Sequence, residues 1–164
     1  MSSFSHFDDS GASRMVDVSK KASTDRIAVA AVEIVMAAET MRRIRDKSFS
    51  KGDVLEVGRL AGIMASKQTS NLIPLCHPLA ISGVTINFDF VNETTLAATA
   101  TVKTTGQTGV EMEALTAASV TALTVYDMCK SVDRAMVIQR LRLLEKQGGK
   151  SGHYKRETDE SDTQ

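Results

Sequence analysis

The chain places its entire supply of proline around one cysteine and one histidine. Pro74 and Pro78 are its only two prolines, and they enclose Cys76 and His77 in the stretch LIPLCHPLA. Proline fixes its own backbone and disfavours helix at the residue before it, so this stretch is predicted to be extended and stiff. It is either a rigid connector or a loop that presents reactive side chains.

Both residues in this stretch have a structural and a chemical interpretation. His77 is either a structural loop histidine or a group that binds a ligand and transfers protons near neutral pH. Cys76 is more typical of a small packed residue than of a nucleophile. Neighbouring side chains on an extended backbone point to opposite sides, so the two are not expected to hold one metal ion together.

Two acidic residues flank Met112 at the start of a long apolar segment. Glu111 and Glu113 are favoured in the first turn of a helix by its dipole, which is a sufficient structural explanation. However, the two are about 200° apart around a helix, so at least one is predicted to face a pocket or a partner. The free N–H groups at such a helix start, preceded by the glycine-containing segment 105–109, also suit an anion.

Asp127 and Lys130 lie three residues apart near the other end of this segment. An exposed ion pair is the structural interpretation. Because the surrounding residues are mostly apolar, we expect Asp127 to be partly buried, which would make it a candidate for acid–base catalysis. Asp127 is about 21 Å along a helix axis from Glu113. If both act on one small substrate, the site must be assembled from two subunits.

The candidate phosphate-binding residues are basic side chains scattered along the chain. Lys51 precedes Gly52, a residue that lets a backbone approach a ligand closely, and Lys150 lies in GGKSG. GGKSG lacks the first glycine and the following helix of a P-loop, so that motif is rejected. Arg26 and Lys67 are the other two candidates. Each of these four residues is otherwise an ordinary solvated cation.

Composition excludes several classes of function. The formal net charge of the 164 residues is zero and aromatic residues make up 4%. A neutral, aromatic-poor chain is not typical of proteins that bind nucleic acid or an anionic membrane. The two distant cysteines, the absence of a long apolar run and the polar start predict a cytoplasmic protein without disulfides or a structural zinc site.

We predict one catalytic domain at residues 14–152, with flexible tails at 1–13 and 153–164. Asp53 is a helix cap candidate and residues 92–93 a turn. The patterns predict strands at 26–36, 84–91, 96–104 and 135–146, and helices at 38–47, 53–67 and 109–132. This order predicts an α+β fold, the ferredoxin-like split βαβ sandwich, with an antiparallel sheet and helices on one face.

The helix predicted at 109–132 has apolar residues at nearly every angle around its axis. The apolar side of the hairpin at 84–104 also suggests association. A helix buried all round in so small a domain indicates a neighbouring subunit. We therefore expect a homo-oligomer.

Long, specific strings of this sequence resemble the cyclic pyranopterin monophosphate synthase family, the MoaC family of molybdenum cofactor biosynthesis. They are KQTSNLIPLCHPL, TGVEMEALTAASVTALTVYDMCKSVD and GGKSG, and the resemblance runs from about residue 15 to residue 152. The resemblance implies a lyase that rearranges 3',8-cyclo-7,8-dihydro-GTP to cyclic pyranopterin monophosphate and releases pyrophosphate.

The resemblance also implies roles for individual residues. It makes Asp127 the catalytic acid or base, with Lys51 and Lys130 as essential partners, and places the substrate against Leu75–His77 and Met112–Glu113. It implies a hexamer, a trimer of dimers, and we expect the sites at a subunit interface. We expect a small-molecule nucleotide as the only other partner and no metal or cofactor, apart from Mg²⁺ that the triphosphate could carry.

Two rival functions remain open at this point. A structural or binding module would use these charges only as helix caps and surface pairs. A metal-dependent hydrolase would instead use His77, Cys76, Cys129 and Asp127 as ligands.

Overall fold

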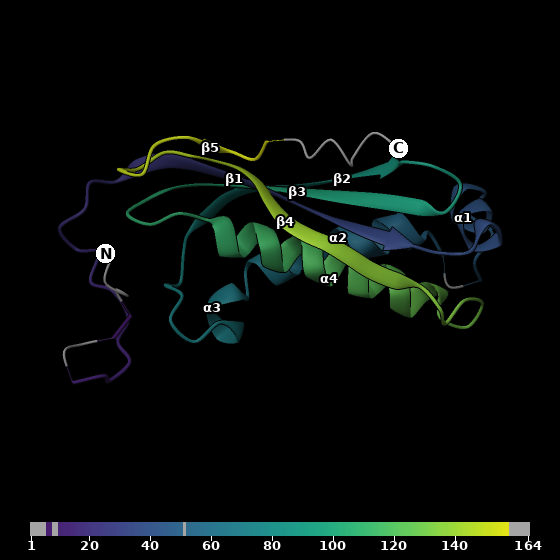
Figure 1. Cartoon of the computed structure of the whole chain (residues 1–164), viewed down its shortest axis with the longest axis horizontal. Helices are drawn as coiled ribbons and strands as arrows, with labels where there is room; N and C mark the ends of the chain where they lie inside the picture. The colour runs from purple at the N-terminus through teal and green to yellow at the C-terminus, as the bar shows by residue number, and fades with distance from the viewer. Residues whose placement is uncertain (1–5, 8–9, 51, 158–164) are drawn as a thin grey trace.

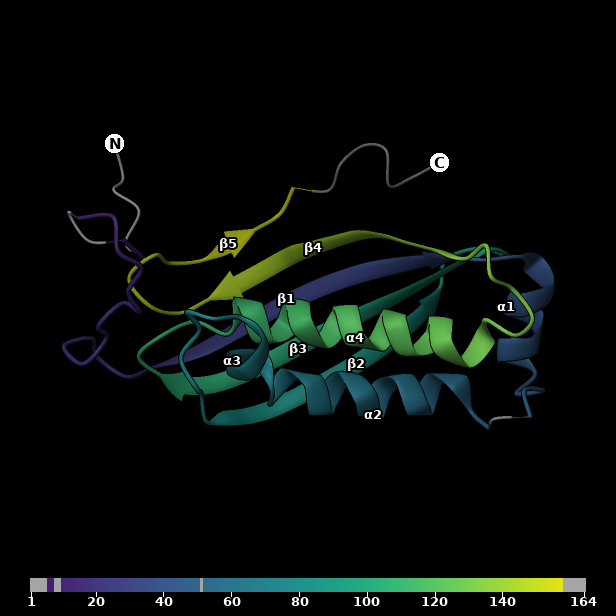
Figure 2. The ribbon, with the colours of Figure 1, turned by 90° about the horizontal axis from the view of Figure 1, so that it is seen from below.

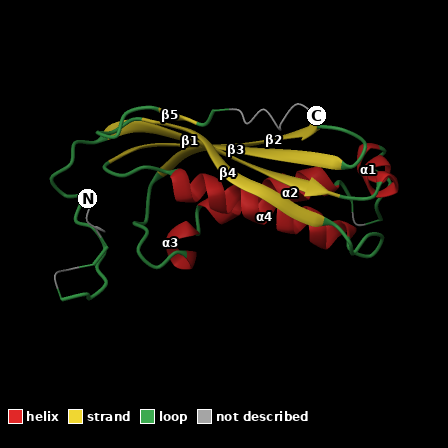
Figure 3. Cartoon of the chain, viewed as in Figure 1, coloured by secondary structure: helices red, strands yellow, loops and turns green. Residues whose placement is uncertain are grey.

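Strand β1 (Thr24–Val35) lies inside a five-stranded antiparallel sheet whose order is β2-β3-β1-β4-β5. The computed structural model describes residues 6–7, 10–50 and 52–157 (Figure 1). The remaining elements are α1 (Ala38–Arg45), α2 (Val54–Ser66), α3 (Thr69–Leu72), β2 (Ile81–Phe90), β3 (Thr95–Gly106), α4 (Glu111–Cys129), β4 (Val137–Gln147) and β5 (Tyr154–Lys155). The chain is thus a mixed α/β structure with an antiparallel sheet, as predicted (Figure 3).

The sheet buries one face because the side chains of its central strands β1 and β3 largely alternate between the two faces. Ala28, Ala30, Val32 and Ile34 of β1 are fully buried, whereas the residues between them are mostly half-buried. This period of two confirms the strand predicted at residues 26–36. Strand β1 pairs with β3 on one side and with β4 on the other.

The predicted hairpin is also confirmed, and its turn is held by a side chain. The Asn92 carboxamide oxygen accepts hydrogen bonds from the backbone N–H groups of Thr94 and Thr95. The apolar side of β2 packs inside the chain, since Ile86 is buried and Phe88 packs against the core. Ile86 is therefore covered by its own chain, and association through the rest of this side stays a prediction.

Helices α2 and α4 cover one face of the sheet (Figures 1 and 2). Asp53 caps α2 as predicted, accepting hydrogen bonds from the N–H groups of Leu55 and Glu56. All four alanines of α4 are buried in the core, but Leu123 on the same helix is 56% exposed. Helix α4 is therefore not buried all round by its own chain, and the oligomer stays a prediction.

Close packing of α2 against α4 depends on one of two neighbouring glycines. A Cβ at Gly62 would collide with the Thr121 hydroxyl, which donates to the Ala117 carbonyl. A Cβ at Gly58 would make ordinary contacts no closer than 3.4 Å.

We expect Gly62→Ala to lower the free energy of unfolding by about 1–3 kcal/mol through overpacking. Gly58→Ala, the matched control, should raise it by up to about 1 kcal/mol through helix propensity. Urea unfolding checks both, and equal effects would contradict this packing.

The C-terminal part of the sheet holds an element that the sequence patterns do not reveal. Tyr154 and Lys155, inside the predicted tail, form β5 beside β4. The domain and tail boundaries stay a prediction, and residues 1–5, 8–9 and 158–164 lie outside the described part of the chain.

Candidate active site

The stretch between the two prolines lies on a cavity of about 270 Å³. Leu75, Cys76 and His77 all line it, together with Met112 and Glu113 from the first turn of α4. This supports the interpretation of the stretch as a loop that presents side chains. The resemblance groups the same five residues around the substrate, and the fold brings them together at one place.

Glu113 is a deeply buried carboxyl in the wall of this cavity. The residue is only 3% exposed. Burial raises the pKa of its carboxyl, and the negative charge of Glu111 raises that pKa further. Glu111 lines the same cavity, which confirms that at least one acid of the pair faces a pocket. A buried carboxyl whose pKa is raised in this way is a candidate for a general acid or base.

Cys76 is not poised for nucleophilic attack. Burial raises the pKa of its thiol, with a further contribution from the charge of Glu113. A thiol with a raised pKa carries little of the thiolate that attacks substrates or binds metals. Cys76 therefore shapes the cavity rather than acting as a nucleophile.

The raised pKa of Glu113 predicts that the wild-type carboxylate destabilises the fold. At a pH below its ordinary pKa, the carboxyl is neutral in both the folded and the unfolded chain, so its ionisation does not change the free energy of unfolding. As the pH rises from there through the raised pKa of the folded state, ionisation favours the unfolded chain. Glu113→Gln cannot ionise, so we expect it to equal the wild type in acid and to be more stable above that window.

Urea unfolding at acidic and neutral pH measures this difference, with Glu93→Gln on the exposed turn as a control expected to show none. A Glu113→Gln variant that is less stable than the wild type at neutral pH would contradict the burial argument.

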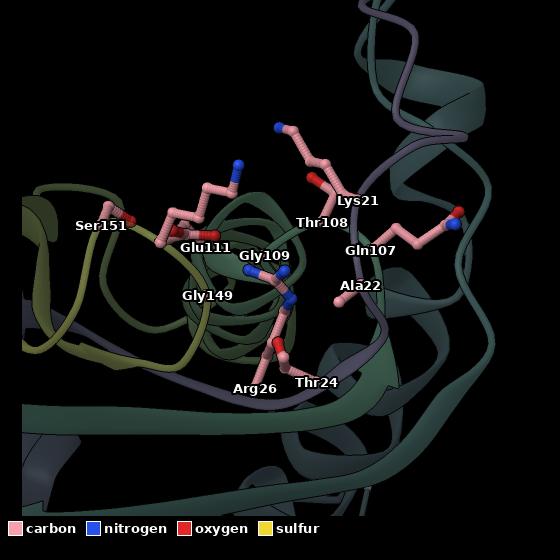
Figure 4. A pocket seen from close by; sticks show the side chains of 11 residues that line it. Lys21, Ala22, Thr24, Arg26, Gln107, Thr108, Gly109, Glu111, Gly149 and Ser151 are labelled. Carbon is pink, nitrogen blue, oxygen red and sulfur yellow. The ribbon is translucent and has the colours of Figure 1, made fainter.

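A second, larger cavity of about 520 Å³ has a basic lining. Arg26, Lys150 and Lys21 contribute cations to it, and Figure 4 shows Arg26 rising from β1 into the cavity. The Arg26 Nε donates to the Gly106 carbonyl at 2.9 Å, which fixes the guanidinium against the end of β3. Gly149 has a φ of +75°, and a Cβ there would collide with the Arg26 guanidinium. A side chain at position 149 would therefore displace Arg26.

The two cavities adjoin at the start of α4. Lys21, Thr108, Gly109 and Glu111 line both of them. No side chain among the described residues caps the N-terminus of this helix at Val110. The arrangement therefore offers one elongated site, with cations at one end and the buried Glu113 with His77 at the other.

Asp127 and Lys130 lie at the opposite end of α4. Their side chains form an ion pair of 2.6 Å and are 63% and 52% exposed. The expected partial burial of Asp127 is therefore wrong for the single chain. Hydrogen bonding to Asp127 raises the pKa of the Lys130 ammonium. The length of α4 separates this pair from the two cavities of the same chain.

Of the other predicted basic residues, only Lys67 lies within the described part of the chain. Lys67 is the C-cap of α2 and is exposed, and it is not among the described residues that line them. Lys51 lies outside the described residues.

Comparison with known proteins identifies the family. The MoaC family model matches residues 15–149, which is most of the chain. The chain belongs to the MoaC family. The relatives named cyclic pyranopterin monophosphate synthase include the following three. That of Desulfitobacterium hafniense is 60% identical over 152 residues, 93% of each chain. That of Heliobacterium modesticaldum is 58% identical, covering 96% of this chain and 99% of its own. That of Bacillus subtilis is 56% identical, covering 98% of this chain and 96% of its own.

The first residues of the matched region form a wall of the smaller cavity that the sequence analysis did not predict. Val16, Val18 and Lys21 all line the smaller cavity. Val16 and Val18 are half-buried while Asp17 between them is exposed. The alternation in MVDVS is the available signal for an extended segment with one covered side.

The described part of this MoaC chain provides no group of three or more His, Cys, Asp and Glu residues that could hold a metal ion. The rival hydrolase needs four such residues together, but Cys129 is buried in the core and Asp127 is exposed at the far end of α4. None of the described helices is both long and apolar enough to cross a bilayer.

Proposed function

We infer that this MoaC-family chain is a cyclic pyranopterin monophosphate synthase. It is a lyase of molybdenum cofactor biosynthesis that rearranges 3',8-cyclo-7,8-dihydro-GTP to cyclic pyranopterin monophosphate with release of pyrophosphate. The relatives of that name match nearly the whole chain at 54–60% identity. The observation that carries the inference is the pair of adjoining cavities, one basic and one holding a buried acid and an imidazole.

The basic cavity is suited to bind the triphosphate of the substrate. Arg26, Lys150 and Lys21 concentrate positive charge locally in a protein with zero net charge. Phosphoryl transfer depends mainly on positioning and charge neutralisation, and closing the cyclic phosphate diester releases pyrophosphate. The guanidinium of Arg26, held by the Gly106 carbonyl, provides a fixed cation for this purpose.

The smaller cavity is suited to bind the fused rings of the substrate. Opening a purine-derived ring and closing a pterin ring require protons to be removed and supplied at defined atoms. Glu113, with its raised pKa, and His77 are suited to this work. The two prolines hold the backbone around His77 in place, which matters because a misplacement of about 1 Å erodes the rate steeply.

Asp127, Lys130 and Lys51 complete the proposed catalytic set. Because Asp127 and Lys130 lie far along α4 from the cavities, we propose that a second copy of the chain supplies them. The sites then lie at subunit interfaces of a hexamer built as a trimer of dimers. Lys67 is proposed to bind substrate in that assembly.

The finer fold assignment is part of the same proposal. The order β2-β3-β1-β4, with α2 and α4 on one face, supports a ferredoxin-like split βαβ core. We propose that the reaction needs no resident cofactor and that any Mg²⁺ arrives on the triphosphate. A cytoplasmic location stays a prediction.

Incubation of the purified chain with authentic 3',8-cyclo-7,8-dihydro-GTP tests the proposed function. We expect mass analysis to show cyclic pyranopterin monophosphate and an equimolar amount of pyrophosphate. An unchanged substrate, or hydrolysis to a linear monophosphate without ring rearrangement, would contradict it. Treating the protein with a chelator before the assay, and then adding Mg²⁺ back, measures whether the metal ion is required.

A further inference from the structure

The N-terminal segment passes along the smaller cavity and contacts the imidazole of His77. The Nε2 atom of His77 lies 2.8 Å from the backbone carbonyl oxygen of Val16. A carbonyl oxygen can only accept a hydrogen bond, so Nε2 must be the donor. A neutral imidazole carries one N–H, which leaves the lone pair on Nδ1. Among the described residues, Nδ1 has no hydrogen-bond partner.

A second carbonyl of the same segment is held from another loop. The side-chain amide of Gln107 donates to the Ser19 carbonyl at 3.2 Å. Gln107 lies directly before Thr108 and Gly109, two of the four residues that line both cavities. Residues 16–19, here called the strap, thus join the loop of His77 to the loop that precedes α4.

We propose that the strap holds His77 in the Nε2–H tautomer, so that Nδ1 is the nitrogen that accepts a proton in the reaction. Val16, through its carbonyl, and Gln107, through the strap, are positioning residues. A free imidazole exchanges between two tautomers and rotates, and only one of these arrangements offers the lone pair at Nδ1 in a fixed direction. The strap excludes the other tautomer and the other ring orientations before substrate binds. Partners that orient a metal-bound imidazole through its second nitrogen contribute about 10–100-fold, and we expect an effect at the lower end of that range for His77, which holds no metal in this proposal.

This inference rests on the proposed function for the role of His77, but its first test does not need substrate. Nitrogen NMR of the full chain labelled at its three histidines reports which ring nitrogen carries the proton, and His77→Gln assigns the signal. At an alkaline pH, where imidazoles are neutral, we expect Nε2 of His77 to be protonated and Nδ1 not. In Gln107→Leu, which is similar in size but has no donor, we expect the His77 signals to move toward tautomer exchange. An Nδ1–H tautomer, or identical signals in the two proteins, would overturn the proposal.

Kinetics then separate positioning from direct contact with substrate. We expect Gln107→Leu to lower kcat about tenfold with little change in KM. Gln107→Lys, which keeps a nitrogen donor of similar reach, should recover most of the lost kcat. Lys20→Ala, an exposed residue beside Ser19, is the control and should match the wild type. A raised KM with unchanged kcat in Gln107→Leu would overturn the proposal. A held tautomer in a protein without any synthase activity would contradict the proposed function instead.

Discussion

Asp127→Asn is expected to lower kcat by about 10²–10⁴-fold, the usual contribution of a general acid or base. The substitution keeps the size and shape of the side chain but removes its ability to exchange a proton. Its cost to the fold should be small, because the ion pair with Lys130 is exposed and such pairs contribute little to stability. The circular dichroism spectrum and the unfolding midpoint should therefore stay close to those of the wild type.

Initial rates of pterin formation measure this loss. Asp46→Asn, at the exposed C-cap of α1, is a matched control that should retain full activity. Near-normal turnover by Asp127→Asn would remove Asp127 from the mechanism. A structural or binding module would give no turnover even in the wild type, so the same assay also separates the proposed enzyme from this rival.

Two inactive variants are expected to restore activity when they share an oligomer. If His77 and Asp127 of one site come from different copies, a His77→Ala chain paired with an Asp127→Asn chain forms one intact site and one doubly defective site. Random pairing then gives about a quarter of the wild-type activity, because half of the pairs are mixed and each two-fold pair has two equivalent sites.

The matched control mixes His77→Ala with Glu113→Ala. These residues line one cavity of one chain, so every site in the mixed oligomer keeps a defect and no activity should return. Copies with different affinity tags allow the mixed oligomers to be purified before the assay. Pure mixed oligomers of the first pair that remain inactive would show that His77 and Asp127 do not act across an interface.

The parts of the fold that could be predicted are those with local causes. The alternation in β1 and the turn at Asn92 depend on neighbours in sequence, and so does the Asp53 cap. The residues around the smaller cavity were recognisable because two prolines and a glycine-containing helix start are strong local signals. That these residues lie together in one cavity could be seen only in the folded structure.

The parts that could not be predicted depend on distant contacts or on helix rotation. Asp127 follows Val125 and precedes Met128 and Cys129, which are all buried, yet it points outward. Successive helical residues turn by about 100°, so apolar neighbours do not imply burial. Strand β5 has only two residues and exists because β4 offers an edge to pair with. The strap is held by His77 and Gln107, which are far from it in sequence.

The most direct test of the central claim is a crystal structure of the Asp127→Asn protein with the cyclised nucleotide bound. The account predicts the triphosphate against Arg26 and Lys150, and the fused rings between His77 and Glu113. It also predicts the substituted side chain at position 127 of a second copy within hydrogen-bond distance of the rings. Rings bound with position 127 of every copy remote from them, or an active protein that is a monomer in solution, would contradict it.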